Sequence, residues 1–109
     1  SVVFSGSSAS PAVTINGAGF GTEPTGQPAN CSTSGDDFDT NRLWLQDGTG
    51  WTAGQFGDCI GLIVGSWTNT SITYTFGSGY PTFGTLNNGD SYSLAVQGAM
   101  TSATVTGLT

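Results

Sequence analysis

The sequence lacks the side chains on which most enzymatic chemistry depends. It has no histidine and no lysine, and its one basic side chain is Arg42. A Ser-His-Asp triad is therefore excluded, and most nucleophiles have no activating base. A glycosidase needs only two carboxylates about 5 to 10 Å apart, and seven acidic residues are present. However, the small β-sandwich predicted below rarely offers a deep enough cleft, so we expect no enzymatic activity.

Charge is scarce as well, at 7% of residues against about 25% in an ordinary domain. The formal net charge is −6. Nucleic acid and anionic membranes both require a basic surface, so neither is expected as a partner. No apolar run is long enough to cross a bilayer, and no signal peptide stands at Ser1. We expect a mature exported protein or a module of one.

Cysteine occurs only twice, at Cys31 and Cys59. Two cysteines without histidine cannot complete a four-ligand zinc site. They predict a disulfide, and the alternative is a pair of buried free thiols. A disulfide forms in oxidising compartments, which favours a secreted, extracellular location.

Period-two alternation of apolar residues recurs along the chain, and no segment has a helical pattern. The length of 109 residues fits one domain, 1–109. Strands are predicted at 2–4, 12–16, 41–46, 59–66, 71–76, 91–97 and 102–106. About seven short antiparallel strands predict an all-β, immunoglobulin-like β-sandwich. Two long connections, 17–40 and 47–58, interrupt the pattern, and the cysteines would tie one to the other. Loops of this length are usually functional or tethered.

Three stretches of the sequence resemble IPT/TIG domains. The first follows their opening P-x-V-x-I-x-G-x-G-F-G and comprises Pro11, Val13, Ile15, Gly17, Gly19, Phe20 and Gly21. Another resembles the W-(S/T)-x-T-x-I strand entry and comprises Trp67, Thr68, Ser71 and Ile72. The last is similar to the final core hairpin and comprises Leu86, Gly89, Asp90, Tyr92, Leu94 and Val96. The resemblance covers nearly the whole chain and implies an immunoglobulin-like sandwich.

The middle of the chain departs from that family through an inserted segment, Asn30 to Asp58. This segment resembles IPT/TIG-like modules of secreted soil-bacterial proteins, including short β-glucan-binding modules of cellulases. IPT/TIG domains occur in receptors, enzymes and transcription factors, so the family pattern assigns no ligand residues.

Candidate sugar contacts are therefore chosen from the residues themselves. Sugar binding needs aromatic platforms with polar neighbours. Leu43 and Leu45 are expected to point inward, which places Trp44 on the opposite face with Arg42 and Gln46. The alternative is that Trp44 packs beneath the first long loop.

Aromatic residues in two loops are further candidates. Trp51 lies in a glycine-rich loop, where the alternative to ligand contact is loop anchoring. Tyr80 and Phe83 lie in a glycine-flanked loop, where the alternative is that one of them caps the core. Trp67 is expected to pack in the core or at a sheet edge.

The acidic cluster of Asp36, Asp37 and Asp39 offers the oxygen ligands that calcium prefers. It predicts a structural calcium ion, and the alternative is turn chemistry on a solvated loop. No other cofactor is expected.

Together these features predict a monomeric, non-catalytic carbohydrate-binding module. Its expected partner is a neutral polysaccharide of the β-glucan class, such as cellulose, mixed-linkage glucan or xyloglucan. We expect the module to be fused to a secreted glycoside hydrolase. The alternative is a structural or adhesive immunoglobulin-like spacer whose aromatics only fix long loops.

Overall fold

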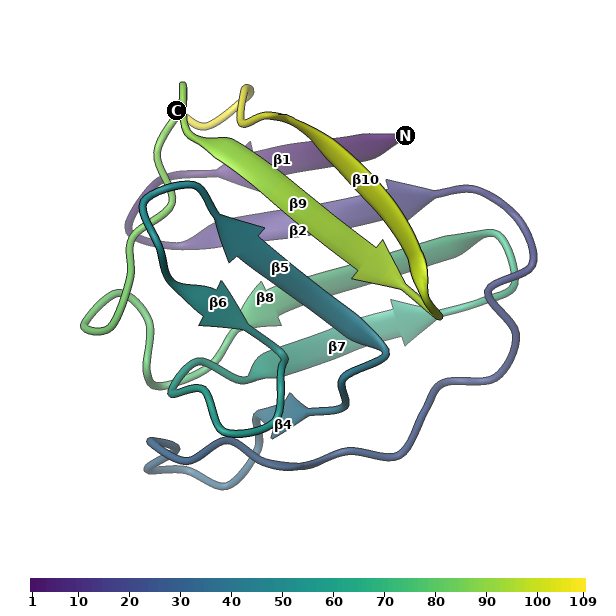
Figure 1. Ribbon diagram of the computed structural model, residues 1–109, viewed down its shortest axis with the longest axis horizontal. Helices are drawn as coiled ribbons and strands as arrows, with labels where there is room; N and C mark the ends of the chain where they lie inside the picture. The colour runs from purple at the N-terminus through teal and green to yellow at the C-terminus, as the bar shows by residue number, and fades with distance from the viewer.

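The computed structural model of residues 1–109 has ten strands, which form two stacked antiparallel sheets (Figure 1). The six-stranded sheet has the order β1 (Val2–Gly6), β2 (Pro11–Asn16), β8 (Ser71–Phe76), β7 (Leu62–Trp67), β4 (Phe38–Asp39) and β3 (Gln27–Pro28). The four-stranded sheet has the order β10 (Ala99–Thr104), β9 (Ser91–Val96), β5 (Leu43–Asp47) and β6 (Thr52–Ala53). None of these elements is a helix, so no membrane-spanning helix is present.

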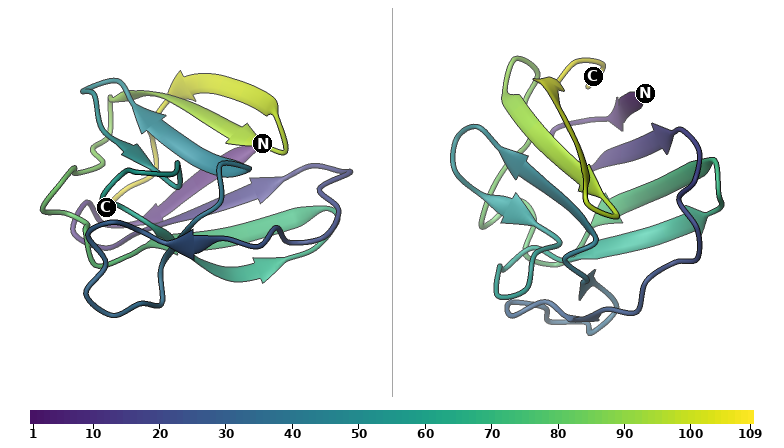
Figure 2. Two further views of the ribbon diagram at one scale, coloured as in Figure 1. Left: turned by 60° about the horizontal axis from the view of Figure 1, so that its bottom comes forward. Right: turned by 45° about the vertical axis from the view of Figure 1, so that its right-hand side comes forward.

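The core lies between the two sheets, whose separation is visible in Figure 2. Leu43 and Leu45 of β5 are 1% and 0% exposed, and they belong with Ile72 and Tyr74 of β8 to one cluster of 16 buried residues. Successive side chains of a strand point to opposite faces, so the buried set on each strand fixes which residues lie on the outside.

The predicted all-β sandwich is confirmed, and each of the seven predicted strands has a counterpart. The predicted boundaries of the last strand were wrong, because β10 starts at Ala99 and not at 102. Gln97 and Gly98 both have positive φ, at 50° and 88°. This pair forms a tight two-residue turn of the kind that joins twisted hairpin strands directly.

Short pairings organise the two long connections that were predicted as loops. β3 and β4 pair with each other inside 17–40, and β4 also pairs with β7 at Phe38 and Leu62. β6 folds back on β5 inside 47–58. The predicted strand 59–66 begins later, at Leu62, because Ile60 instead makes an isolated parallel bridge to Ala53.

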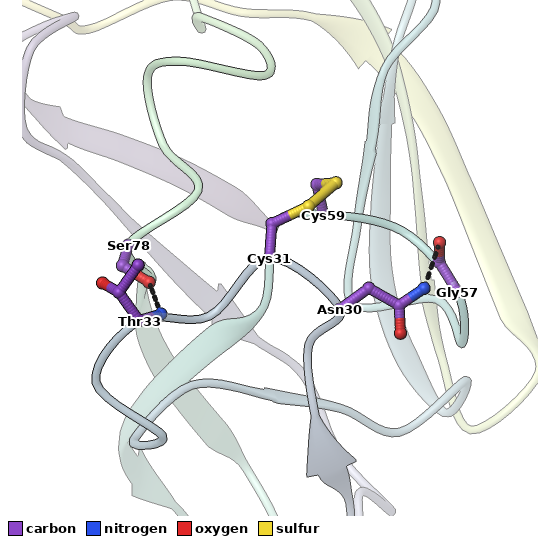
Figure 3. Close-up of a disulfide and its surroundings, with 6 residues drawn as sticks. All are labelled: Asn30, Cys31, Thr33, Gly57, Cys59 and Ser78. Atoms are coloured by element: carbon purple, nitrogen blue, oxygen red, sulfur yellow. Dashed lines mark hydrogen bonds between the residues drawn. A yellow bond between two sulfur atoms is a disulfide. The ribbon is translucent and has the colours of Figure 1, made fainter.

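The predicted disulfide between Cys31 and Cys59 is present (Figure 3). Hydrogen bonds flank it on both sides. The Asn30 side-chain amide donates to the Gly57 carbonyl at 3.1 Å, and the Thr33 backbone amide donates to the Ser78 hydroxyl at 2.9 Å. The bond and its flanks hold the first long connection against the second and against the loop that follows β8.

Candidate functional site

The outer face of the four-stranded sheet carries Trp44, the second residue of β5. Its neighbours Leu43 and Leu45 are buried on the inner face, so the Trp44 ring stands on the outside, where it is half-buried. Trp44 is not part of the core cluster or of the hydrophobic residues packed against it. Figure 1 looks onto this face, with β5, β9 and β10 in front of the larger sheet. The Trp44 ring is therefore not a core residue.

An apolar row crosses the sheet at Trp44. Ala95 of β9 lies opposite Trp44, and Met100 of β10 lies opposite Ala95. Ala95 is only 3% exposed although it points outward, because larger side chains flank it on both sides. Met100 itself is 61% exposed. The three residues therefore form an apolar strip with accessible surface at both ends.

A polar row runs beside the apolar strip. Gln46 of β5 lies opposite Ser93 of β9, and Ser93 lies opposite Ser102 of β10. The hydroxyls of Ser93 and Ser102 hydrogen-bond at 2.9 Å. The row borders a shallow hollow of about 360 Å³, which is lined by Gln46, Asp47, Gly48, Gly50, Ser91, Tyr92, Ser93, Ser102 and Ala103. Amide and hydroxyl groups thus lie next to an indole ring on one open face.

Arg42 is exposed just before β5 begins. Two of the six residues predicted as sugar contacts, Trp44 and Gln46, share one face of β5. Their partners on the adjacent strands, Ser93 and Ser102, were not selected from the sequence. The outward-facing serines of 91–97 were a signal for them, but only the strand register places them beside Gln46.

Trp51 and Tyr80 lie elsewhere, in an aromatic cluster with Phe76 at one end of the sandwich. The ring centroid of Trp51 is 5.9 Å from that of Phe76 and 6.1 Å from that of Tyr80, and Phe76 and Tyr80 stack at 5.1 Å. Both Trp51 and Tyr80 pack against the core. The Tyr80 hydroxyl also donates to the Ser8 carbonyl and accepts from the Leu86 amide. For Trp51 these contacts correspond to the loop-anchoring alternative, and for Tyr80 to the alternative that one aromatic of its loop caps the core.

Phe83 is 52% exposed on the loop between β8 and β9. This loop passes over the aromatic cluster, because a Cβ added at Gly84 would collide with the Trp51 ring. Phe83 is thus an accessible aromatic near Trp51, away from the strand that carries Trp44. The two groups of predicted contacts do not converge on a single surface.

Trp67 packs against the core, as its sequence context predicted. Its indole N–H donates to the Gly21 carbonyl at 2.9 Å, which fixes the first long loop beside the ring. Another hollow, of about 150 Å³, is lined in part by Trp67, with Phe38, Glu23 and Asp36 also among its lining residues. It is smaller than the hollow beside Gln46 and Ser93.

The three aspartates predicted to hold calcium are not brought together. Asp36 is exposed, whereas Asp37 and Asp39 are buried at 0% and 1% exposure. No group of three metal-binding side chains forms in the structure. Asp39 instead lies within hydrogen-bond reach of Asp58. Burial, and then the neighbouring Asp58 charge, raise the pKa of Asp39 to about 8.

A second carboxyl pair, Asp47 and Asp90, lies at the turn after β5. Asp47 is fully buried, and its Oδ1 accepts hydrogen bonds from the Thr49 amide at 2.8 Å and the Thr49 hydroxyl at 2.7 Å. Burial raises the pKa of Asp47 above its ordinary 3.8, and the adjacent Asp90 carboxyl raises it further.

The raised pKa of Asp47 predicts a specific pH dependence of stability. Above pH 3.8 the unfolded chain releases a proton from Asp47 that the folded protein keeps. The contribution of Asp47 to folding stability is therefore lost as pH rises through the pKa of Asp47 in the folded protein. Asp47→Asn should therefore gain stability relative to the wild type as the pH rises above 3.8. Urea unfolding in buffer with chelator measures this difference. The exposed-site variant Asp36→Asn is the control. If the stability of Asp47→Asn followed the same pH profile as that of the wild type, the prediction would be contradicted.

Comparison with known proteins adds no assignment: no protein-family model matches the chain, and neither a curated protein nor a solved structure matches it. The resemblance to IPT/TIG domains and to β-glucan-binding modules therefore stays a prediction from the sequence.

Proposed function

We propose that the protein is a non-catalytic carbohydrate-binding module that binds a neutral β-glucan on the outer face of its four-stranded sheet. The observation that carries this proposal is the position of Trp44. Its ring is half-buried beside the polar row of Gln46, Ser93 and Ser102, and it is not among the residues that pack against the core.

The chemistry of this face matches that of an extended neutral glycan. The C–H faces of a pyranose are apolar and pack against an aromatic ring, while its hydroxyls need directed hydrogen bonds at the edge of that ring. Trp44 supplies the ring, and Gln46 and the serines supply donors and acceptors. Arg42 is the only basic side chain of the protein, so a polyanion would gain little from binding here.

The surroundings of the module follow from the same proposal. The disulfide is compatible with an extracellular protein, because such bonds persist in oxidising compartments. We propose that the module is fused to a secreted glycoside hydrolase, because a non-catalytic binding face can hold an attached enzyme on its substrate. We also propose that the module acts as a monomer.

Affinity electrophoresis in gels containing soluble β-glucan tests the proposal. The wild type should be retarded by at least one of cellulose derivatives, mixed-linkage glucan or xyloglucan. Trp44→Ala should weaken binding about 30-fold, since truncating an aromatic at the centre of an interface costs about 2 kcal/mol or more. Phe83→Ala, which removes an accessible aromatic outside this face, is the matched control and should bind as the wild type does.

A structural or adhesive spacer is the second candidate, and the positions of Trp51 and Tyr80 favour it. Both rings fix loops by packing inside the aromatic cluster. A spacer predicts no change of tryptophan fluorescence on adding oligosaccharides and no retardation in any glucan gel. Those results together would replace the glucan proposal.

A further inference from the structure

The closed edge of the sandwich, where β4 of one sheet meets β6 of the other, contains two carboxyl groups in contact. Asp39 ends β4, and the chain that follows is held to β6 because the backbone amides of Thr40 and Asn41 donate to the Gly54 carbonyl at 3.0 and 3.1 Å. Asp58 lies in the loop that leaves β6 and comes within hydrogen-bond reach of Asp39. Two acidic side chains from different sheets thus share one small volume.

Both carboxyl groups have oxygens without a partner. Asp39 is 1% exposed and turned toward Asp58, yet its Oδ1 accepts no hydrogen bond. Asp58 Oδ2 accepts from the Thr52 hydroxyl and the Gln55 amide at 3.0 Å each, while its Oδ1 is buried with no partner. Buried polar atoms are normally satisfied, and an unsatisfied one points to an unaccounted ion, proton or water.

No side chain of the protein offers positive charge to this pair. The one basic residue, Arg42, is exposed. The nearby Asp37 is fully buried and adds negative charge, with its own Oδ2 unpartnered. Burying like charges together is costly unless a cation or another partner offsets them. The negative charge of the pair is therefore offset by something other than a basic side chain, either a shared proton or a bound cation.

We propose that Asp39 and Asp58 bind one calcium ion that links the two sheets at this edge. Calcium takes six to eight oxygen ligands in a flexible arrangement. The two carboxylates supply up to four of these ligands when both bind bidentately, and backbone carbonyls and water supply the rest. Of the acidic residues predicted from the sequence, only Asp39 is retained, and Asp58 replaces Asp36 and Asp37.

The disulfide holds one half of this site in place. Cys59 directly follows Asp58, and the Asn30 backbone amide donates to the Asp58 carbonyl at 3.3 Å, next to the bond from the Asn30 side chain to Gly57 (Figure 3). The loop that carries Asp58 is therefore tethered to the first long connection before a cation binds. A tethered loop loses less conformational freedom on binding, which favours affinity.

Calcium titration of the wild-type protein tests the site directly. After treatment with chelator at about pH 8, calorimetric titration should detect one site, and about 10 mM calcium should raise the melting temperature by about 5 to 15 °C if affinity is in the range of extracellular modules. Magnesium should produce a smaller shift, because it requires stricter octahedral geometry. No binding heat and an unchanged melting temperature with calcium would overturn the proposal.

Replacing either proposed ligand should abolish the calcium response without destabilising the calcium-free protein. Asp39→Asn and Asp58→Asn each remove a repelling charge, so they should match or exceed the melting temperature of the wild type in chelator while losing the calcium response. Asp36→Asn changes an exposed acid of the same connection and should keep the full response. If Asp39→Asn kept the wild-type calcium response, or if Asp36→Asn lost it, the ligand assignment would be wrong. None of these measurements depends on glucan binding.

Discussion

Replacing both cysteines, as in Cys31→Ser with Cys59→Ser, is expected to lower the free energy of unfolding by about 3 to 4 kcal/mol. The disulfide closes a loop with a sequence separation of 28. In the chain-entropy model, removing it raises the conformational entropy of the unfolded chain, which lowers the free energy of unfolding. For a domain of this size the melting temperature should fall by about 10 °C or more. Denaturant unfolding of the oxidised wild type and the double variant measures the difference.

The control for this experiment is Ser78→Ala, which removes only the hydrogen bond from the Thr33 amide beside the disulfide. It should cost about 1 kcal/mol. A double variant that loses no more stability than Ser78→Ala would contradict the tethering role given to the disulfide.

Leu45→Ala is expected to produce a loss of similar size through a different mechanism. Leu45 is fully buried in the middle of β5, directly under the outer face, and its truncation leaves a cavity that costs about 2 to 5 kcal/mol. Gln46→Ala, on the next residue and the opposite face, should change stability by about 0.5 kcal/mol or less. Thermal unfolding of the two variants compares the faces. Equal losses would show that the assignment of inner and outer faces along β5 is wrong.

The regular strands were predictable because burial imposes period two on the sequence. Ile72 and Tyr74, for example, are buried on β8 as their alternation predicted. The short strands β3, β4 and β6 were not predictable, since two residues carry no period. The early start of β10 was hidden because it depends on Gln97, a residue that adopts positive φ only in the folded turn.

The candidate site was predictable only where it lies on one strand. Trp44 and Gln46 share a face by alternation alone, so their common position follows from local sequence. Ser93 and Ser102 join them through the pairing register of three strands, which local sequence does not determine. Asp58 meets Asp39 only because the hairpin of β5 and β6 returns the chain to the edge of the sandwich.

Trp51 illustrates the limit of inferring exposure from loop composition. Its glycine-rich surroundings suggested an exposed ring, but the Asp47 amide donates to the Trp51 carbonyl at 2.9 Å and closes a hairpin. Two residues later, Ala53 pairs with the inward-facing Leu45, so alternation turns Trp51 inward as well. The ring then packs against Phe76 and Tyr80.

The central claim is that the outer face of the four-stranded sheet binds glucan. The most direct test is a two-dimensional ¹⁵N–¹H NMR titration of the wild-type protein with a soluble β-glucan oligosaccharide. We predict that the shifted resonances are confined to the Trp44 indole, the Gln46 side-chain amide and the backbone amides around Ser93 and Ser102. Shifts confined instead to the aromatic cluster and Phe83, or no shifts at millimolar oligosaccharide, would contradict the claim.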